Sequence, residues 1–305
     1  MNKLLSIFKN YALLWAMVIG AIFNSYLFHL KPLLPINLFI MLTLSYTRIK
    51  PTDLKVRKIH WLMLAVQWAL GIMSYLIIAP FNTVIALGVA LIILTPTATA
   101  ASVVTHILGG SVAFVTTMLL MGNIAIALFG PLLISWVNPN IATSYGETVL
   151  SILSQVSLLL FLPLAIVWGL RYLLPKWHDK LASRAGDTFY VWAFNVMIVA
   201  ATAVHSFKVN EELTWKFGIL LALITLATTV GMYFIGGRLA KWNGEAVVNG
   251  RQGVGQKNTV FAIWLGISFL SPEVALIPTF YIIWQNVINS LEISAQKNKD
   301  SKNNE

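Results

Sequence analysis

The chain has 305 residues, of which 58% are hydrophobic and only 10% are charged, and its mean hydropathy is +0.77. Soluble domains carry about 25% charged residues, so this composition excludes a soluble globular protein and predicts that lipid covers much of the surface. The absence of cysteine excludes disulfides, thiolate metal sites and cysteine nucleophiles.

The first predicted element is a membrane-spanning helix. Residues 1–10 carry Lys3 and Lys9 before an apolar run, which is also how a signal peptide begins. The run 11–30 is long enough to cross a bilayer, which takes about 20 residues. No small-residue cleavage site follows it, so we expect a retained helix. With the apolar segments that follow, the chain has ten predicted spans: 11–30, 33–47, 60–80, 83–108, 111–137, 147–172, 188–206, 214–236, 246–271 and 273–292.

The basic residues indicate how these spans are oriented. The formal net charge of +10 would indicate a nucleic-acid partner in a soluble protein. Here, ten spans with the N-terminus inside place most of the 21 Lys and Arg residues on the cytoplasmic side, as the positive-inside rule requires. We therefore expect no nucleic-acid partner and an integral protein of a bacterial inner membrane with both termini in the cytoplasm. Residues 1–294 are predicted to form one transmembrane domain, and 295–305 a disordered tail rich in Lys, Asn and Ser.

Two predicted spans contain helix-breaking residues near their middle. The fourth contains Pro96, and the ninth contains Gly253 and Gly255. Inside lipid, a break is tolerated only within protein or beside a cavity. Each interrupted span is the fourth of five in its half of the chain, with the halves at about 11–137 and 147–292. Matched interruptions in two inverted halves point to a transport site, although two ordinary kinks are the alternative.

The predicted fold class is therefore all-α: a polytopic membrane protein of ten transmembrane helices, arranged as two inverted five-helix repeats. Helices 4 and 9 are predicted to be discontinuous, with Pro96, Gly253 and Gly255 as the helix-break residues.

Lys257 is the one strongly basic residue near the middle of a predicted span, whereas the eleven acidic residues fall in loops, tails or span ends. A charged lysine at that depth costs roughly 2.5–3.5 kcal/mol and is a functional candidate. Three roles are open. The ammonium could attract an anion together with the positive ends of half-helices, it could lose its proton, or it could occupy the place of a metal cation. No Ser/His/Asp set or paired carboxylates fall at membrane depth, so we do not expect an enzyme.

Four stretches in chain order carry a family resemblance. They are 38–53 with its end Lys50-Pro51-Thr52-Asp53, Gln67 in the third span, residues 95–105 (TPTATAASVVT) and Trp284-Gln285-Asn286. They resemble the second-helix exit, the third-helix glutamine, the fourth-helix crossover and the tenth-helix Trp-His-Asn of the bile acid:sodium symporter family. The resemblance covers essentially the whole chain. It implies a panel of spans 1, 2, 6 and 7 that rocks against a core of spans 3–5 and 8–10 and carries organic anions with sodium.

The sodium-binding residues depart from the family. The ninth-helix motif Glu-x-Gly-x-Gln-Asn falls on residues 252–257, so the glutamine is kept as Gln256, the glutamate becomes Gln252 and the asparagine becomes Lys257. The second sodium site thus keeps Gln67 and Gln256 without a carboxylate. An uncompensated sodium ion in a low dielectric is costly.

At the first sodium site, the family's asparagine falls on Ser102 and its hydroxyl ligands fall on Val115 and Leu119. Apolar side chains cannot bind sodium. We therefore predict that two-sodium coupling is lost or remodelled, that the chain needs no cofactor or metal, and that Lys257 supplies a fixed or titrating positive charge.

The predicted function is alternating-access transport of a small organic anion, with the lipid bilayer and that anion as partners and a homo-oligomer left open. A sodium:organic anion symporter of the bile acid type and a non-transporting membrane sensor are the alternatives. Packing remains open for Gln67 and Asn286, and helix capping for Thr99, Asn258 and Thr259. The predicted substrate- or ion-binding residues are Gln67, Thr99, Ser102, Gln252, Gln256, Lys257, Asn258, Thr259 and Asn286.

Overall fold

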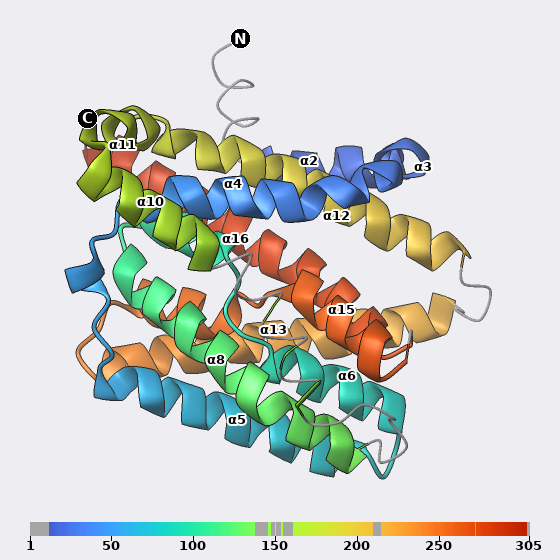
Figure 1. Ribbon diagram of the computed structural model, residues 1–305. Coiled ribbons are helices and arrows are strands. Elements are labelled where there is room, and N and C mark those ends of the chain that lie inside the picture. Colours follow the sequence, from blue (N-terminus) through green and yellow to red (C-terminus); the bar gives the residue numbers. More distant parts are fainter. Residues whose placement is uncertain are drawn as a thin grey trace.

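The computed structural model describes residues 12–137, 146–147, 150, 154, 161–209, 215–271 and 273–303, and these form an all-helical bundle (Figure 1). Helices lie at the positions of the predicted spans, although most of the first half of the segment 147–172 lies outside the described residues. The helices that cross the bundle are α2 (Ala12–Ile22), α4 (Leu34–Tyr46), α5 (Lys58–Ile78), α6 (Thr83–Leu94), α7 (Ala100–Ile107), α8 (Val112–Val137), α10 (Leu162–Leu173), α12 (Thr188–Val209), α13 (Trp215–Trp242), α15 (Thr259–Phe269) and α16 (Leu276–Asn303). Shorter elements are α3 (Asn24–Leu27), η1 (Phe28–Leu33), η2 (Pro51–Asp53), α11 (Pro175–Ala182), η4 (Ala185–Asp187), α14 (Val247–Gly250) and the π-helix η5 (Arg251–Gly255).

Four helical stretches within the described residues are long and apolar enough to cross a membrane. They are Asn24–Tyr46, Lys58–Ile78, Val112–Ile134 and Trp215–Trp242. Thr83–Leu94 and Leu162–Leu173 are apolar but shorter. The first of these two is short because a break ends it at mid-segment, which is what the sequence predicts for the fourth span.

The helices form two groups, which we call the panel group and the core group. Figure 1 shows the panel group, α2, α4, α10 and α12, along one side of the bundle. Within it, α12 packs along α2 and α4, and α4 packs along α10. The core group consists of the remaining crossing helices, with α5 packed on α6, and α13 on η5, α14 and α16. The panel and core that the family resemblance implies, and the movement of one against the other, remain predictions.

Both predicted interruptions are present. The α6 helix ends at Leu94, residues 95–99 are non-helical, and α7 begins at Ala100. Pro96 lies in this gap and supplies no backbone N–H, so the helix cannot continue through it. In the ninth segment, the non-helical residues are 256–258, between η5 and α15. The break therefore follows directly after the two glycines rather than at them.

Close packing requires a glycine at position 255 but not at Gly253, where a Cβ would make only ordinary contact with Met118. The only positive-φ glycines among the described residues are Gly109 and Gly244, so Gly253 and Gly255 supply no left-handed turn. A Cβ on Gly255 would collide with the ring of Tyr233 on α13. Farther along the same contact, a Cβ on Gly250 would collide with the backbone carbonyl of Gly236. Missing side chains thus allow the interrupted helix to lie against α13.

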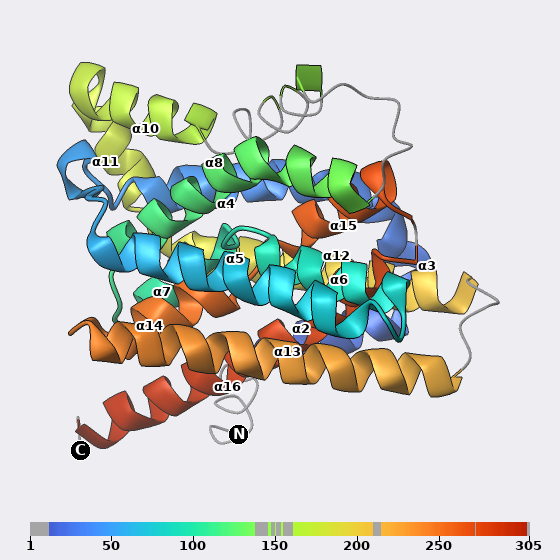
Figure 2. The ribbon, with the colours of Figure 1, turned by 90° about the horizontal axis from the view of Figure 1, so that it is seen from below.

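The C-terminal tail differs from the prediction of disorder. The α16 helix continues through residues 295–303 to Asn303, and Figure 2 shows its end projecting beyond the other helices. The helix is already nucleated within the bundle, where Ile293 and Ser294 are buried. Extending an existing helix costs much less than starting one, so a polar tail can add turns to it. Glu292 consequently lies within a helix rather than at the end of a span.

Candidate functional site

The two breaks cross each other and pair through their main chains. Thr97 and Lys257 form an antiparallel bridge. Beside it, the Ala98 N–H donates to the Gln256 carbonyl at 2.8 Å, and the Asn258 N–H donates to the Pro96 carbonyl at 2.9 Å. Each break therefore satisfies backbone groups that the other leaves open, as an apolar surrounding requires.

A side chain adds a further link between the breaks. The Thr97 hydroxyl donates to the Gly253 carbonyl at 2.6 Å, so the residue after Pro96 also holds the last turn of η5. The two interrupted helices thus form one connected crossing.

Lys257 is completely buried, with 0% of its surface exposed. Its ammonium donates to the carbonyls of Ile93 at 2.8 Å and Thr95 at 3.0 Å. In an unbroken helix, each of these carbonyls would accept a hydrogen bond from the backbone N–H four residues later. The break removes those partners, and the Lys257 ammonium takes their place. The two carbonyls lie at the C-terminal, partially negative end of α6. Among the ion pairs between described residues, none includes Lys257.

Gln67 approaches the same helix end from α5. Its amide nitrogen donates to the carbonyls of Leu94 and Thr95, each at 3.2 Å, so Gln67 and Lys257 share the Thr95 carbonyl. The Gln67 side-chain oxygen is buried without a partner among the described residues. The Lys257 ammonium therefore takes the kind of carbonyl partners that a small cation would take.

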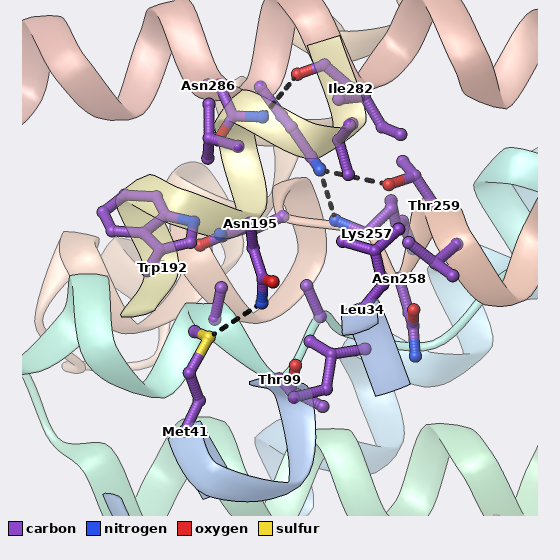
Figure 3. A pocket seen from close by; sticks show the side chains of 18 residues that line it. Leu34, Met41, Thr99, Trp192, Asn195, Lys257, Asn258, Thr259, Ile282 and Asn286 are labelled. Atoms are coloured by element: carbon purple, nitrogen blue, oxygen red, sulfur yellow. Dashed lines mark hydrogen bonds between the residues drawn. The ribbon is translucent and has the colours of Figure 1, made fainter. Parts of the chain in front are cut away.

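A cavity of about 70 Å³ lies beside the crossing, between the core and panel groups (Figure 3). It brings together six of the predicted site residues: Thr99, Gln256, Lys257, Asn258, Thr259 and Asn286. The panel side is lined by Leu34, Leu38 and Met41 of α4 and by Trp192, Asn195, Val196 and Val199 of α12.

The N-terminal ends of two half-helices contribute to this cavity. Thr99 and Ala100 at the start of α7 line it, as do Asn258 and Thr259 at the start of α15. The Asn258 side-chain oxygen accepts from the Phe261 N–H at 3.2 Å and so caps α15. Thr99 makes no side-chain capping bond. The capping alternative thus holds for Asn258 but not for Thr99.

The tenth segment adds two amide side chains. Gln285 accepts from the Lys257 backbone N–H at 3.0 Å, and its own nitrogen lies 3.5 Å from the Thr259 hydroxyl. Asn286 also lines the cavity and donates to the Ile282 carbonyl of its own helix at 2.8 Å. Gln285 was not among the predicted site residues, although it stands at the center of the motif Trp284-Gln285-Asn286 that carried the resemblance.

A comparison with protein families bears on this arrangement. The model of the SBF-like CPA transporter family matches residues 36–288, which include both breaks and nearly the whole lining of the cavity. The chain belongs to this family. The match confirms the predicted resemblance to proteins of the bile acid:sodium symporter type, and it identifies the chain as a membrane transporter of that type. No curated protein matches the chain.

Within this family member, three predicted residues lie away from the cavity lining: Gln67, whose contacts with the end of α6 are given above, Ser102 and Gln252. Ser102 bonds the Thr116 hydroxyl at 3.1 Å. The neighbouring Val115 and Leu119 are fully buried in apolar clusters. The Ser102 hydroxyl is therefore hydrogen-bonded to another hydroxyl. The two positions where the family has further sodium ligands carry apolar side chains.

The Gln252 side chain is bonded to α16 rather than directed into the cavity. Its nitrogen donates to Asn289 at 3.1 Å and to the Glu292 carboxylate at 3.0 Å, and Arg251 forms an ion pair with the same carboxylate. Glu292 is thus the carboxylate that contacts the interrupted segment η5. Because α16 runs past its predicted end, this residue can reach η5 from inside a helix.

Sequence reasoning missed Asn195 of α12. Its nitrogen lies 3.3 Å from the Met41 sulfur, and its oxygen accepts from Asn37 at 2.9 Å. The available signal was a single amide near the middle of the predicted span 188–206. A polar residue at that depth is a candidate in its own right, but nothing in the sequence places it opposite the crossing.

Proposed function

We propose that this transporter carries a small organic anion by alternating access, with the anion bound in the cavity beside the crossed breaks. The observation that carries the proposal is the convergence of two half-helix N-termini, those of α7 and α15, on one cavity. Such ends carry partial positive charge, and interrupted transporter helices use them to hold anionic groups. Lys257, which lines the same cavity, adds positive charge there in its protonated form.

We further propose that transport needs no sodium. The Lys257 ammonium is bonded to two carbonyls at the end of α6. A sodium ion beside Gln67 would be repelled by it, and no carboxylate on residues 252–257 would offset the repulsion. Lys257 thus acts as a fixed charge that stabilises the crossing in place of a transported cation.

The apolar interface between the panel group and the core group is where the cavity can open to one side of the membrane. Met41 and Trp192 of the panel group belong to one buried cluster with Val103 and Val104 of α7 and Ile293 of α16. In the orientation predicted from the basic residues, this cluster lies on the cytoplasmic side of the cavity. Separation of the panel from the core along it would open the cavity toward the cytoplasm, because no hydrogen bond has to be broken between these side chains.

The test is thermal stabilisation of the purified protein by a panel of organic anions in sodium and in potassium buffer, followed by uptake into proteoliposomes. We expect at least one anion to stabilise the protein in potassium alone and to be taken up. Stabilisation that requires sodium would instead favour a sodium:organic anion symporter. Binding without saturable uptake would favour a membrane sensor.

A further inference from the structure

A second hollow lies on the outer surface of the core group, between α5 and α8. We call it the α5–α8 groove, and its volume is about 420 Å³, several times that of the cavity beside the crossing. Figures 1 and 2 show both helices at the outside of the bundle. The groove is lined by Trp61, Leu64, Ala65 and Trp68 of α5 and by Ala125, Phe129, Leu132 and Leu133 of α8.

The groove exists because two alanines lie among bulky neighbours. Ala65 on α5 and Ala125 on α8 leave space between the larger side chains around them. The space opens outward, since 62% of Trp61 and 52% of Phe129 are exposed. The rings of Trp68 and Phe129 meet edge to face, with centroids 5.6 Å apart, and so join the two helices across the groove.

The chemistry of the lining is that of a site for hydrocarbon. Apart from two indole N–H groups, every side chain in it is apolar, and exposed apolar patches of this kind mark places where an apolar partner binds. Both helices are long and apolar enough to cross a membrane, so the surroundings of the groove are lipid tails. Its volume is of the same order as that of one acyl chain.

A positive charge lies at one end of the groove. Lys58 is the first residue of α5 and precedes Trp61 by three positions, so it lies on the same face of the helix, one turn nearer the membrane surface. Its side chain is exposed, and no ion pair between described residues includes it. The neighbouring Arg57 is paired with Glu245. Lys58 is therefore the unbalanced cation where this helix enters the membrane.

The groove and the charge have the relative depth of a lipid's tail and headgroup. Along α5, the lining from Trp61 to Trp68 lies about 5–15 Å beyond Lys58, at 1.5 Å per residue. This distance is within half of a hydrocarbon core of about 30 Å. The α8 lining belongs to the second half of that helix. The groove thus leads from the charged end of α5 into the hydrocarbon, as an acyl chain does below its headgroup.

We infer that the α5–α8 groove binds an anionic phospholipid of the surrounding membrane, with its headgroup beside Lys58 and one acyl chain along the groove. A helix of a second copy could fill the groove with apolar side chains but would leave Lys58 without an anion. The inference goes beyond the proposed function, because it concerns the lipid-facing surface of the core group rather than the transport cavity.

The site is mapped with two phospholipid probes that carry the same photoactivatable diazirine acyl chain, one with a phosphatidylglycerol and one with a phosphatidylcholine headgroup. The full-length protein is placed in phosphatidylcholine nanodiscs that hold one copy each and a small fraction of one probe. After illumination, the labelled residues are identified by mass spectrometry. We expect labelling within residues 61–68 and 125–133. The phosphatidylglycerol probe should label them about fivefold more, because one lysine near the surface favours an anionic lipid by about that factor.

Equal labelling by the two probes, or no labelling of these residues, would overturn the inference.

Two substitutions test the headgroup and the chain separately. Lys58→Gln removes the charge and should lower labelling by the phosphatidylglycerol probe to the level of the phosphatidylcholine probe, whose own labelling is kept. Ala65→Phe fills the groove and should lower labelling by both probes severalfold. Ala65→Leu adds less volume, should act in the same direction and serves if the phenylalanine variant does not fold. A headgroup preference that survives Lys58→Gln, or full labelling of a filled groove, would contradict the site.

The matched controls are Lys241→Gln and Ala227→Phe on α13. Both side chains are exposed, and neither lines the groove. Labelling of the groove should be unchanged in both variants. Effects equal to those of Lys58→Gln and Ala65→Phe would show that overall charge or added bulk decides lipid binding, and would overturn the inference.

Bilayers that hold several copies of the protein test the other occupant. We expect the groove to be labelled by the phosphatidylglycerol probe there as well. Cross-links between the groove residues of two copies, together with loss of lipid labelling, would show that a second copy fills the groove and would overturn the inference.

Discussion

Thr97 and Lys257, which belong to opposite halves of the chain, face each other as an antiparallel pair where two broken helices cross. The pair is flanked by main-chain hydrogen bonds of 2.8 and 2.9 Å. This relationship sets the direction of the Lys257 side chain, because the backbone of the second break is held against the first. The ammonium then reaches the carbonyl end of α6 rather than the membrane surface.

Replacing Lys257 should abolish uptake. Lys257→Ala leaves the carbonyls of Ile93 and Thr95 buried without a donor, at a cost of about 1–3 kcal/mol for each group, and removes the positive charge. Lys257→Met retains most of the side-chain volume and should also be inactive, even if it folds. Uptake into proteoliposomes is compared with the melting temperature of each variant. Normal transport by either one would contradict the assigned role.

The contact between α13 and α14 should tolerate no added methyl group. Gly250→Ala places a Cβ against the Gly236 carbonyl, and overpacking of this kind costs about 1–3 kcal/mol. The melting temperature in detergent should fall. Gly231→Ala is the matched control on α13, since nothing lies within 4 Å of a Cβ there. It should be neutral or slightly stabilising, because alanine restricts the unfolded chain. Equal effects at both positions would contradict the packing described.

The ion pair between Arg251 and Glu292 should contribute more to stability than an exposed pair. Glu292→Leu leaves the partly buried Arg251 without its carboxylate and removes the acceptor of Gln252, and we expect a loss of about 2 kcal/mol. Asp187→Asn weakens the pair with Arg184, whose side chains are 75% and 49% exposed, and should cost less than about 0.5 kcal/mol. Chemical denaturation of both variants measures the difference, and a Glu292→Leu variant as stable as Asp187→Asn would contradict it.

The hydroxyl link between the breaks should be detectable by itself. Thr97→Val keeps the side-chain shape but removes the bond to the Gly253 carbonyl, so we expect a loss of about 1 kcal/mol. Thr202→Val removes a bond to Ile198 within a single helix and should change stability less. Hydrogen exchange at the amides of Ala98 and Asn258 should accelerate only in Thr97→Val. Unchanged exchange there would show that the main-chain pairing does not depend on the hydroxyl.

Sequence reasoning located the interruptions because proline and paired glycines are anomalous within apolar segments, whatever surrounds them. It could not determine what the second break does in space. Gly255 is a glycine because the ring of Tyr233 occupies the position of its Cβ, a contact between residues on different helices. The same limit explains why Gln285 and Asn195 were missed, since each lines the cavity only because α16 and α12 face the crossing.

The errors at the C-terminus have a related cause. Composition describes a segment as if it were alone, and residues 295–303 alone would not hold a helix. Attached to α16, they continue one. Glu292 on the same helix contacts Arg251 and Gln252, and this pairing between two helices could not be read from the composition of either segment.

The crossing of the two breaks has a consequence for how such a protein can change over time. Its central ties join backbone N–H and carbonyl groups, which nearly every amino acid supplies. Substitutions at the side chains around it can therefore alter which ion or solute the site accepts while the framework persists. In a chain built in this way, an amide can replace a carboxylate, or a lysine an asparagine, without a change of fold.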